Sequence, residues 1–330
     1  MTRVTVFGAG AMGTALAMHA ARLGLDVALW ANRYDRRALD AIRTEGRHPA
    51  LPEHVPSSLA VHGPEELEDA AAGCEVAVMG ASSSGARSLA RMVRDAARQA
   101  AFVVSVAKGL EGETGKRVSQ VYEEELPGAT VIAVGGPCLA PELAQGAPSA
   151  SVWSSRGLED ARTAGKPFED RHYQLRYTDD VAGVEYCTVV KNVAAIGMGI
   201  LDGLGKLGDE HFRNAQAALF TSAVHELSAL VTALGGRAET AQGLAGLGDL
   251  LVTSLGGRNR LYGERIGEGA DPQTALDQMV NRGLTVEGVE SARAVHSLAE
   301  EAGLDLPYHQ AVYRVLFGGK DPRHVMDVLC

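Results

Sequence analysis

The glycine-rich segment near the start of the chain constrains its fold more than any other feature. Gly8-Ala9-Gly10-Ala11-Met12-Gly13 directly follows an apolar run at Arg3–Phe7 and opens an Ala-rich helical pattern over 11–23. Between a strand and a helix, such glycines allow a tight turn, close approach of a pyrophosphate and close helix–strand packing. The alternative is a purely structural glycine turn. Because a second strand pattern follows at Asp26–Trp30, we favour a dinucleotide-binding loop with cofactor contacts from Gly8, Gly10, Ala11, Met12 and Gly13.

The rest of the first half alternates short apolar runs with helical patterns. The runs at 75–79, 101–106 and 129–134 are apolar throughout, as expected for parallel strands that are buried on both faces. Two later runs, 149–153 and 174–177, are expected to continue the sheet in mixed direction. This alternation predicts a Rossmann domain with a doubly wound, mostly parallel sheet.

After about residue 180 the apolar periodicity becomes helical. Helices are expected at 184–203, 214–234, 238–244, 260–267, 272–281 and 286–302. Few strand patterns remain in this half. We therefore expect an α/β dinucleotide-binding Rossmann domain over residues 1–182 and an all-α substrate and catalytic domain over residues 183–330.

Composition excludes several classes of function. A formal net charge of −10 argues against nucleic acid as a partner, because binding to a phosphate backbone needs a basic excess. The first strand pattern begins at residue 3, and the most apolar stretch, 186–201, is interrupted by Lys191. We therefore expect no secretory leader, no integral membrane segment and a cytoplasmic protein.

Cysteine and histidine spacing gives no sign of a metal site. The four cysteines are far apart in the sequence: Cys74, Cys138, Cys187 and Cys330. They form no CxxC pair, which favours reduced thiols over a disulfide framework or a zinc site. The histidines show no metal-binding spacing either, so no metal is expected.

The end of the second strand pattern bears on the choice of cofactor. NAD-specific sites usually carry a carboxylate at this strand tip, but this chain reads Trp30-Ala31-Asn32-Arg33. Arg33 is suited to a 2′-phosphate, or it solvates the start of the next helix. The cofactor is thus NAD or NADP; the sequence favours NADPH and leaves NADH open.

Two lysines are candidates for catalysis. Lys191 interrupts an otherwise apolar helical face, so it either extends its ammonium group to the surface or acts in a site. Burial in a cleft would lower its pKa toward the working pH and suit proton transfer to a carbonyl oxygen. Lys108 follows the strand at 101–106, at the end where open α/β sheets bind ligands.

A glycine-rich cluster in the second half is suited to a phosphate. Gly246-Leu247-Gly248-Asp249 is followed by Thr253 and then by Gly256-Gly257-Arg258-Asn259. The glycines bring backbone close to a ligand, and an arginine can contact a phosphate through two N–H groups. The alternative is a capped turn with a surface arginine.

Together these stretches resemble the NAD(P)-dependent glycerol-3-phosphate dehydrogenases over nearly the whole chain. Ordered matches in this number are far more specific than any one of them. The matching pieces are the glycine loop, Ala107-Lys108-Gly109, Gly136-Pro137 through Ala140 and Glu142, Gly183-Val184-Glu185, Lys191-Asn192-Val193, Asp202 to Gly205, Gly208-Asp209, Gly243 to Asp249, Gly257-Arg258-Asn259, Val286-Glu287-Gly288 and Val312-Tyr313.

The resemblance implies hydride transfer between C4 of the nicotinamide and C2 of dihydroxyacetone phosphate or glycerol 3-phosphate. It implies that Lys191 is the general acid/base, that Lys108 reaches the site from the cofactor domain, and that Asp249 orients it. The implied substrate contacts are Lys108, Gly136, Asn192, Thr253, Arg258 and Asn259. Besides the glycine loop, the implied cofactor contacts are Arg33, Lys108, Ala140, Arg258 and Glu287. Family members are commonly dimers, so a homodimer is expected.

The segment after Gly208-Asp209 departs most from the family. The run Glu210 to Gln216 is longer than its counterpart, and Gln216 stands where a basic residue is usual; Arg213 is available to replace that charge. A reductase of a different phosphorylated ketone or hydroxyacid on the same scaffold is therefore an alternative. A non-catalytic dinucleotide sensor is a further alternative, disfavoured because a sensor needs neither the two lysines nor Asp249.

Overall fold

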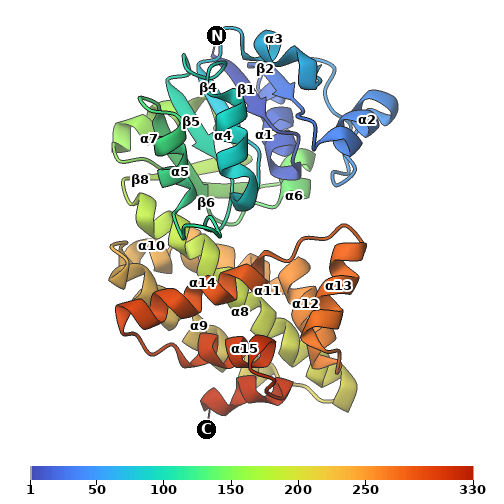
Figure 1. Cartoon of the computed structure of the whole chain (residues 1–330), viewed down its shortest axis with the longest axis vertical. Helices are drawn as coiled ribbons and strands as arrows, with labels where there is room; N and C mark the ends of the chain where they lie inside the picture. The colour runs from blue at the N-terminus through green and yellow to red at the C-terminus, as the bar shows by residue number, and fades with distance from the viewer. Residues whose placement is uncertain (1, 330) are drawn as a thin grey trace. The chain divides into compact units, whose positions relative to one another are not determined.

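The structure, a computed structural model, describes residues 2–329. The chain divides into two compact units, Met1–Val181 (unit 1) and Ala182–Cys330 (unit 2), shown from blue to red in Figure 1. The chain passes from one to the other in the first turn of a long helix, α8 (Val181–Gly208). Each unit has its own secondary-structure class, and each is described by itself.

Unit 1 is built on a single eight-stranded sheet with the strand order β3-β2-β1-β4-β5-β6-β7-β8. Neighbouring strands are parallel except for β6 and β7, which run antiparallel. The strands are β1 (Arg3–Phe7), β2 (Asp26–Trp30), β3 (Ala60–His62), β4 (Val76–Met79), β5 (Phe102–Ser105), β6 (Thr130–Gly135), β7 (Ser149–Ser154) and β8 (Tyr173–Thr178). The predicted doubly wound, mostly parallel sheet is confirmed, including the mixed direction of its last strands.

Helices cover both faces of this sheet (Figure 1). The helices are α1 (Ala11–Arg22), α2 (Arg36–Glu45), α3 (Leu67–Ala71), α4 (Ala86–Val93), α5 (Val118–Glu125), α6 (Ala140–Gln145) and α7 (Leu158–Gly165), with 3₁₀ turns η1 (Pro64–Glu66), η2 (Ser83–Gly85) and η3 (Lys166–Phe168). Val4 and Val6 of β1 pack in the core under α1, α2, α6 and α7, whereas Phe7 packs in the core under α3, α4 and α5. Both faces of the strands are thus buried, which explains why they read as continuous apolar runs.

Strand β3 is absent from the sequence-based prediction, which has no strand between residues 31 and 74. It has three residues, lies at the edge of the sheet beside β2, and none of its side chains is buried. A short, half-exposed edge strand has no apolar run by which it can be recognised.

All the described helices after residue 180 belong to unit 2, and all the described strands belong to unit 1. The all-α class predicted for the second half is confirmed. Besides α8, its elements are α9 (Arg213–Ala233), α10 (Ala238–Gln242), a π-helical turn η4 (Leu244–Gly248), α11 (Asp249–Leu255), α12 (Arg258–Gly267), α13 (Pro272–Asn281), α14 (Glu287–Ala302), α15 (Pro307–Phe317) and a 3₁₀ segment η5 (Pro322–Leu329).

Helix α15 was not expected from the sequence because its cap comes from another helix. Glu226 of α9 is buried, and its carboxylate accepts the backbone N–H groups of Tyr308 (2.8 Å) and His309 (3.0 Å). The imidazole Nδ1 of His309 lies 2.6 Å from the same carboxylate. First-turn N–H groups lack intrahelical partners and favour a negative charge, so Glu226 fixes where α15 begins.

Helix α8 forms the centre of unit 2. By length and composition it could cross a membrane, but 94% of its apolar 18-residue window is buried inside the protein. This burial is what the core helix of a folded unit requires, and it explains why the helix has an apolar surface on nearly every side.

Backbone contact between α8 and α12 is possible because each helix presents two glycines, one turn apart. A Cβ at Gly199 or Gly203 of α8 would overlap the carbonyl oxygen of Arg260 or Glu264 of α12. Conversely, a Cβ at Gly263 or Gly267 would overlap carbonyl oxygens of α8. The two helices therefore approach to a distance that no side chain larger than hydrogen allows.

We expect Gly199→Ala to lower the free energy of unfolding by about 3 kcal/mol, the upper end of the usual cost of overpacking, because the added methyl meets backbone rather than a movable side chain. Chemical denaturation measures the loss. Gly256→Ala is the matched control, since Gly256 has an extended φ of −177° and open space around its Cβ position among the described residues. Equal stability of Gly199→Ala and the control would contradict the contact.

Candidate active site

The glycine loop joins β1 to α1 and lies against the end of β4. Gly8 has a φ of +98°, which favours glycine, and a Cβ at Gly10 would lie 2.5 Å from the carbonyl oxygen of Gly80. A Cβ at Gly13 would lie 3.2 Å from Val6 Cγ1 of β1. The N-cap of α1 is Gly10, which has no side chain to cap the first turn. The N–H groups at Ala11, Met12 and Gly13 therefore suit a phosphate, and the loop fits a dinucleotide.

Two side chains that the sequence did not reveal brace this loop. The Oδ2 atom of Asp35 accepts the N–H groups of Ala9 and Asn32, both at 3.0 Å. His48 Nε2 donates to the carbonyl oxygen of Ala9 at 3.0 Å, and its Nδ1 accepts the N–H of Ala50 at 3.0 Å. Burial lowers the pKa of His48, which favours the neutral ring that these two bonds require. The only sequence signal for Asp35 is its place directly before the amphipathic helix α2.

Two of the predicted cofactor residues lie away from these buried contacts. Arg33 is exposed, donates to the Tyr34 hydroxyl at 2.8 Å and has its guanidinium 4.9 Å from the centre of that ring. Ala140 is half-buried and begins α6. The Arg33 side chain is therefore held by one aromatic neighbour on the surface beyond β2.

Lys108 lies beyond the carboxyl end of β5, where it meets the neighbouring strand. Its Nζ donates to the carbonyl oxygen of Gly136 at 3.1 Å, and Gly136 has a φ of +100°. A small pocket of about 20 Å³, room for one water molecule, lies beside them. It is lined by Met12, Leu16, Val106, Lys108, Val134, Gly135, Gly136, Cys138 and Tyr173. The structure thus brings together Lys108, Gly136 and Met12 in unit 1.

In unit 2, Lys191 of α8 forms a buried ion pair with Asp249. The Nζ atom of Lys191 lies 2.7 Å from Asp249 Oδ1, and the two side chains are 5% and 1% exposed. The same Nζ donates to Thr253 Oγ1 at 3.2 Å, and that hydroxyl donates its own proton to the backbone oxygen of Asp249 at 2.6 Å. An isolated buried ammonium would be very costly, so the carboxylate is what allows Lys191 to lie inside the unit.

The π-helical turn η4 delivers Asp249 to this position. A Cβ at Gly246, in the middle of the turn, would overlap the carbonyl oxygen of Ala241. Gly248 N donates to Gly243 O at 3.1 Å, which closes the wide turn. The predicted helix over 238–244 was therefore too long: α10 ends at Gln242, and the glycines beyond it build a wider turn that is common near functional sites.

A chain of side-chain amides links three helices next to Lys191. Asn192 Nδ2 donates to Thr188 O at 3.2 Å, and Asn192 Oδ1 accepts Asn259 Nδ2 at 2.9 Å. Asn259 Oδ1 then accepts the N–H of Gly288 at 2.9 Å. Because each of these bonds pairs a donor with an acceptor, the orientations of the two amides are mutually consistent.

Arg258 and Glu287 lie beside this chain. Arg258 Nη2 is 3.8 Å from Glu287 Oε1, and the two side chains are 50% and 32% exposed. Unit 2 thus holds Lys191, Asp249 and Thr253 in one set of contacts and Asn192 with Asn259 in a second, and the half-exposed Arg258–Glu287 pair lies next to the second.

The segment that departs from the family pattern ends in a contact to α8. Gln216 Nε2 donates to Asp202 Oδ1 at 2.7 Å, while Arg260 Nη2 lies 2.6 Å from the other oxygen of the same carboxylate. Burial raises the pKa of Asp202, and Arg260 opposes that shift. Arg213 begins α9 and is exposed. A neutral amide and one arginine therefore contact the two oxygens of the Asp202 carboxylate.

The cysteines give no cross-link within residues 2–329. Cys74, Cys138 and Cys187 are buried and form no disulfide, and Cys330 lies outside the described residues. In the same part of the chain, no three histidine, cysteine or carboxylate side chains gather as a metal site would require.

Two family models match the chain. The model described as NAD-dependent glycerol-3-phosphate dehydrogenase N-terminus matches residues 3–161, and the one described as NAD-dependent glycerol-3-phosphate dehydrogenase C-terminus matches residues 180–327. The matches cover nearly all of both units.

Individual relatives agree with the family models. A glycerol-3-phosphate dehydrogenase (NAD(P)+) of Chlorobium limicola is 38% identical over 99% of this chain and 97% of that protein. A protein of the same name from Clostridium botulinum is 36% identical over 100% of this chain and 97% of its own length. The crystal structure of glycerol-3-phosphate dehydrogenase from Coxiella burnetii has a TM-score of 0.87 and 31% identity, and the match covers 99% of this chain and 98% of that one. The resemblance inferred from the motifs is confirmed, and the chain belongs to the NAD(P)-dependent glycerol-3-phosphate dehydrogenase family of oxidoreductases.

Proposed function

We propose that the chain interconverts dihydroxyacetone phosphate and sn-glycerol 3-phosphate, with Lys191 as the general acid/base. The observation that carries the proposal is the buried ion pair between Lys191 and Asp249, because a lysine at 5% exposure inside an apolar helix needs a chemical reason to be there. Family membership supports the substrate class, and the geometry supports Lys191 as the residue that handles the proton.

The dinucleotide supplies the hydride when it is bound. The residues proposed to hold it in unit 1 are Gly8, Gly10, Ala11, Met12, Gly13, Arg33, Lys108 and Ala140. The uncapped first turn of α1 supports this assignment, since its N–H groups and helix dipole attract the pyrophosphate. Arg258 and Glu287 are proposed as the cofactor contacts from unit 2.

Reduction adds a hydride to C2 of the ketone and one proton to its carbonyl oxygen. Lys191 donates that proton from Nζ and becomes neutral; in the reverse direction Nζ takes the proton from the hydroxyl group. Asp249 holds Nζ in place through the 2.7 Å contact, and the Thr253 hydroxyl fixes it from a second direction at 3.2 Å. Lys108 is proposed to reach the same substrate from unit 1.

The phosphate end of the substrate is assigned to Arg258 and Asn259, with Gly136 and Asn192 as further substrate contacts. Arg258 supports this assignment through its exposed guanidinium at the start of α12, because charge-assisted contacts to phosphate are strong. Thr253 already donates its hydroxyl proton to Asp249 O, so a contact from Thr253 to phosphate would require the hydroxyl to rotate.

The proposal also includes the roles of the two domains, the location of the protein and its oligomeric state. Residues 1–182 serve as the dinucleotide-binding domain and residues 183–330 as the substrate and catalytic domain. The protein acts in the cytoplasm and forms a homodimer. The compact units found in the chain support the division of labour.

A second candidate is a reductase of a different phosphorylated ketone. The contact of Gln216 with Asp202 favours it, because a neutral amide stands where the family usually has a basic side chain. The deciding assay follows nicotinamide absorbance with dihydroxyacetone phosphate, run with NADH and NADPH in parallel. We expect rapid oxidation; cofactor binding without oxidation of either dinucleotide would favour the second candidate.

Replacing Lys191 tests the proton-transfer role. We expect Lys191→Met to lower turnover by about 10²–10⁴-fold, the usual contribution of one general acid/base. Lys191→Arg keeps a cation beside Asp249 but should be equally slow, because a guanidinium does not release its proton near neutral pH. The matched control is Lys206→Met, an exposed lysine of the same helix that pairs with Glu264. Near-normal turnover by either Lys191 variant would exclude the role.

Replacing Arg33 tests the preference for NADPH. We expect Arg33→Ser to raise the KM for NADPH about tenfold, because one charge-assisted contact to the 2′-phosphate is lost. The KM for NADH should change little, and it serves as the internal control in the same protein. If both KM values rise together, Arg33 does not read the 2′-phosphate.

A further inference from the structure

The connection from β5 to α5 carries Lys108 and is unusually long. It runs over residues 106–117, whereas loops between a strand and the following helix commonly have about 2–6 residues. A loop of this length needs contacts of its own if a side chain on it is to hold one position.

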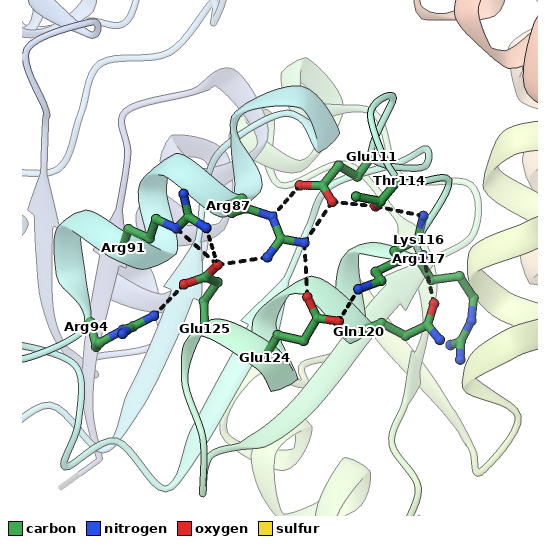
Figure 2. Close-up of polar contacts among 10 residues, drawn as sticks. All are labelled: Arg87, Arg91, Arg94, Glu111, Thr114, Lys116, Arg117, Gln120, Glu124 and Glu125. Atoms are coloured by element: carbon green, nitrogen blue, oxygen red, sulfur yellow. Dashed lines mark hydrogen bonds and ion pairs between the residues drawn. The ribbon is translucent and has the colours of Figure 1, made fainter.

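Arg87 of α4 supplies such contacts at the middle of the connection (Figure 2). Its Nε and Nη2 donate to the two carboxylate oxygens of Glu111 at 2.7 and 2.8 Å. Thr114 Oγ1 donates to the same carboxylate at 2.5 Å. The hydrogen bond from Arg87 holds the pKa of Glu111 below its usual range, so the carboxylate is charged at neutral pH.

The same guanidinium is fixed from the side of α5. Arg87 Nη1 donates to Glu125 at 2.7 Å, and Nη2 lies 3.0 Å from Glu124. Figure 2 shows the three carboxylates arranged around this one side chain. Glu111 and Glu125 are 9% and 7% exposed and Arg87 is 21% exposed, so water screens these contacts less than it screens a surface pair. A planar guanidinium bound to three carboxylates has little freedom to move.

Two residues separate Glu111 from Lys108, and the backbone beside them is held by contacts to the start of α5. Glu111 N donates to Lys116 O at 2.9 Å, and Leu110 pairs with Arg117 in a β-bridge at the start of α5. Gly109 has a φ of +124°, and a Cβ there would lie 2.8 Å from Ser83 Oγ. The backbone on either side of Leu110 is therefore held in place.

We propose that Arg87 is a positioning residue for Lys108: through its two-point contact with Glu111 it holds the 106–117 connection so that Lys108 Nζ stays at Gly136 O. Arg87 lies on α4 and contacts α5 and the connection, and it acts on the reaction only through Lys108. This inference rests on the proposed function for its kinetic consequence, but the anchoring of the connection can be measured without any substrate.

The direct test compares Arg87→Ala with Arg91→Ala by hydrogen exchange of the peptides covering 106–117. Arg91 lies one turn along α4 and, among the described residues, donates to Glu125 and not to the connection. We expect exchange in this segment to rise at least tenfold in Arg87→Ala and to stay near the wild-type rate in Arg91→Ala. Equal exchange in the two variants overturns the anchoring, whatever reaction the enzyme catalyses.

The kinetic test is a double-mutant cycle with Lys108→Ala, run below the melting temperature of every variant. Arg87→Ala alone should lower kcat by roughly 10–100-fold, as a displaced catalytic group does, and the KM for the dinucleotide should change no more than it does in Lys108→Ala, because Lys108 is itself a proposed cofactor contact. Arg87→Lys keeps the charge but loses the two-point contact, so its kcat should lie between those of the wild type and Arg87→Ala. In the Lys108→Ala background, Arg87→Ala should add little, because both changes remove the same contribution.

Additive losses in the cycle would mean that Arg87 acts by another route, and they overturn the proposal. A KM for the dinucleotide that rises more in Arg87→Ala than in Lys108→Ala would do the same, since that effect would not run through Lys108. If the wild-type protein shows no turnover of dihydroxyacetone phosphate, the proposed function fails first, and hydrogen exchange alone still decides whether Arg87 anchors the connection.

Discussion

Contact between backbones without an intervening side chain is the constraint on which both units depend. In unit 2, four glycines let α8 and α12 touch, and this contact brings Asn259 to Asn192. In unit 1, Gly10 lies against the backbone of Gly80, which leaves the start of α1 open to a phosphate. In unit 1 the same glycine thus serves both the packing and the open start of α1, whereas in unit 2 the glycines serve the packing that brings the two asparagines together.

The buried ion pair is a second constraint within unit 2. Lys191 lies on a helix that is apolar on almost every side, so its charge must be balanced by a group that reaches it within unit 2. The π-helical turn brings Asp249 to that point. Breaking such a pair typically costs about 3–5 kcal/mol, whereas replacing it with apolar side chains is often neutral or stabilising. Stability alone therefore does not explain the pair, and the proton-transfer role proposed for Lys191 would account for it.

Some elements of the structure could be predicted from the sequence and others could not, for physical reasons. Strands β1 and β2 match their predicted bounds because buried parallel strands are continuous apolar runs. Helix α15 was missed because its cap, Glu226, comes from a distant part of the chain. The glycine loop was recognised by its spacing, but Asp35 and His48, which brace it, follow no spacing rule. Local patterns therefore reveal elements and loops, whereas contacts between distant segments require the fold.

The two amides next to the ion pair fix the backbone that carries an accessible charge, the guanidinium of Arg258. Asn259 is buried and has a single orientation, because its two amide atoms meet Asn192 and Gly288. Arg258, the preceding residue, is half exposed and paired only loosely with Glu287 at 3.8 Å. The backbone of this arginine is thus fixed to α8 through its neighbour, while its guanidinium can exchange a long ion pair for a closer anion. A phosphate bound at Arg258 would therefore be held at a defined position relative to Lys191, and that fixed spacing is what transfer of a proton to the same substrate requires.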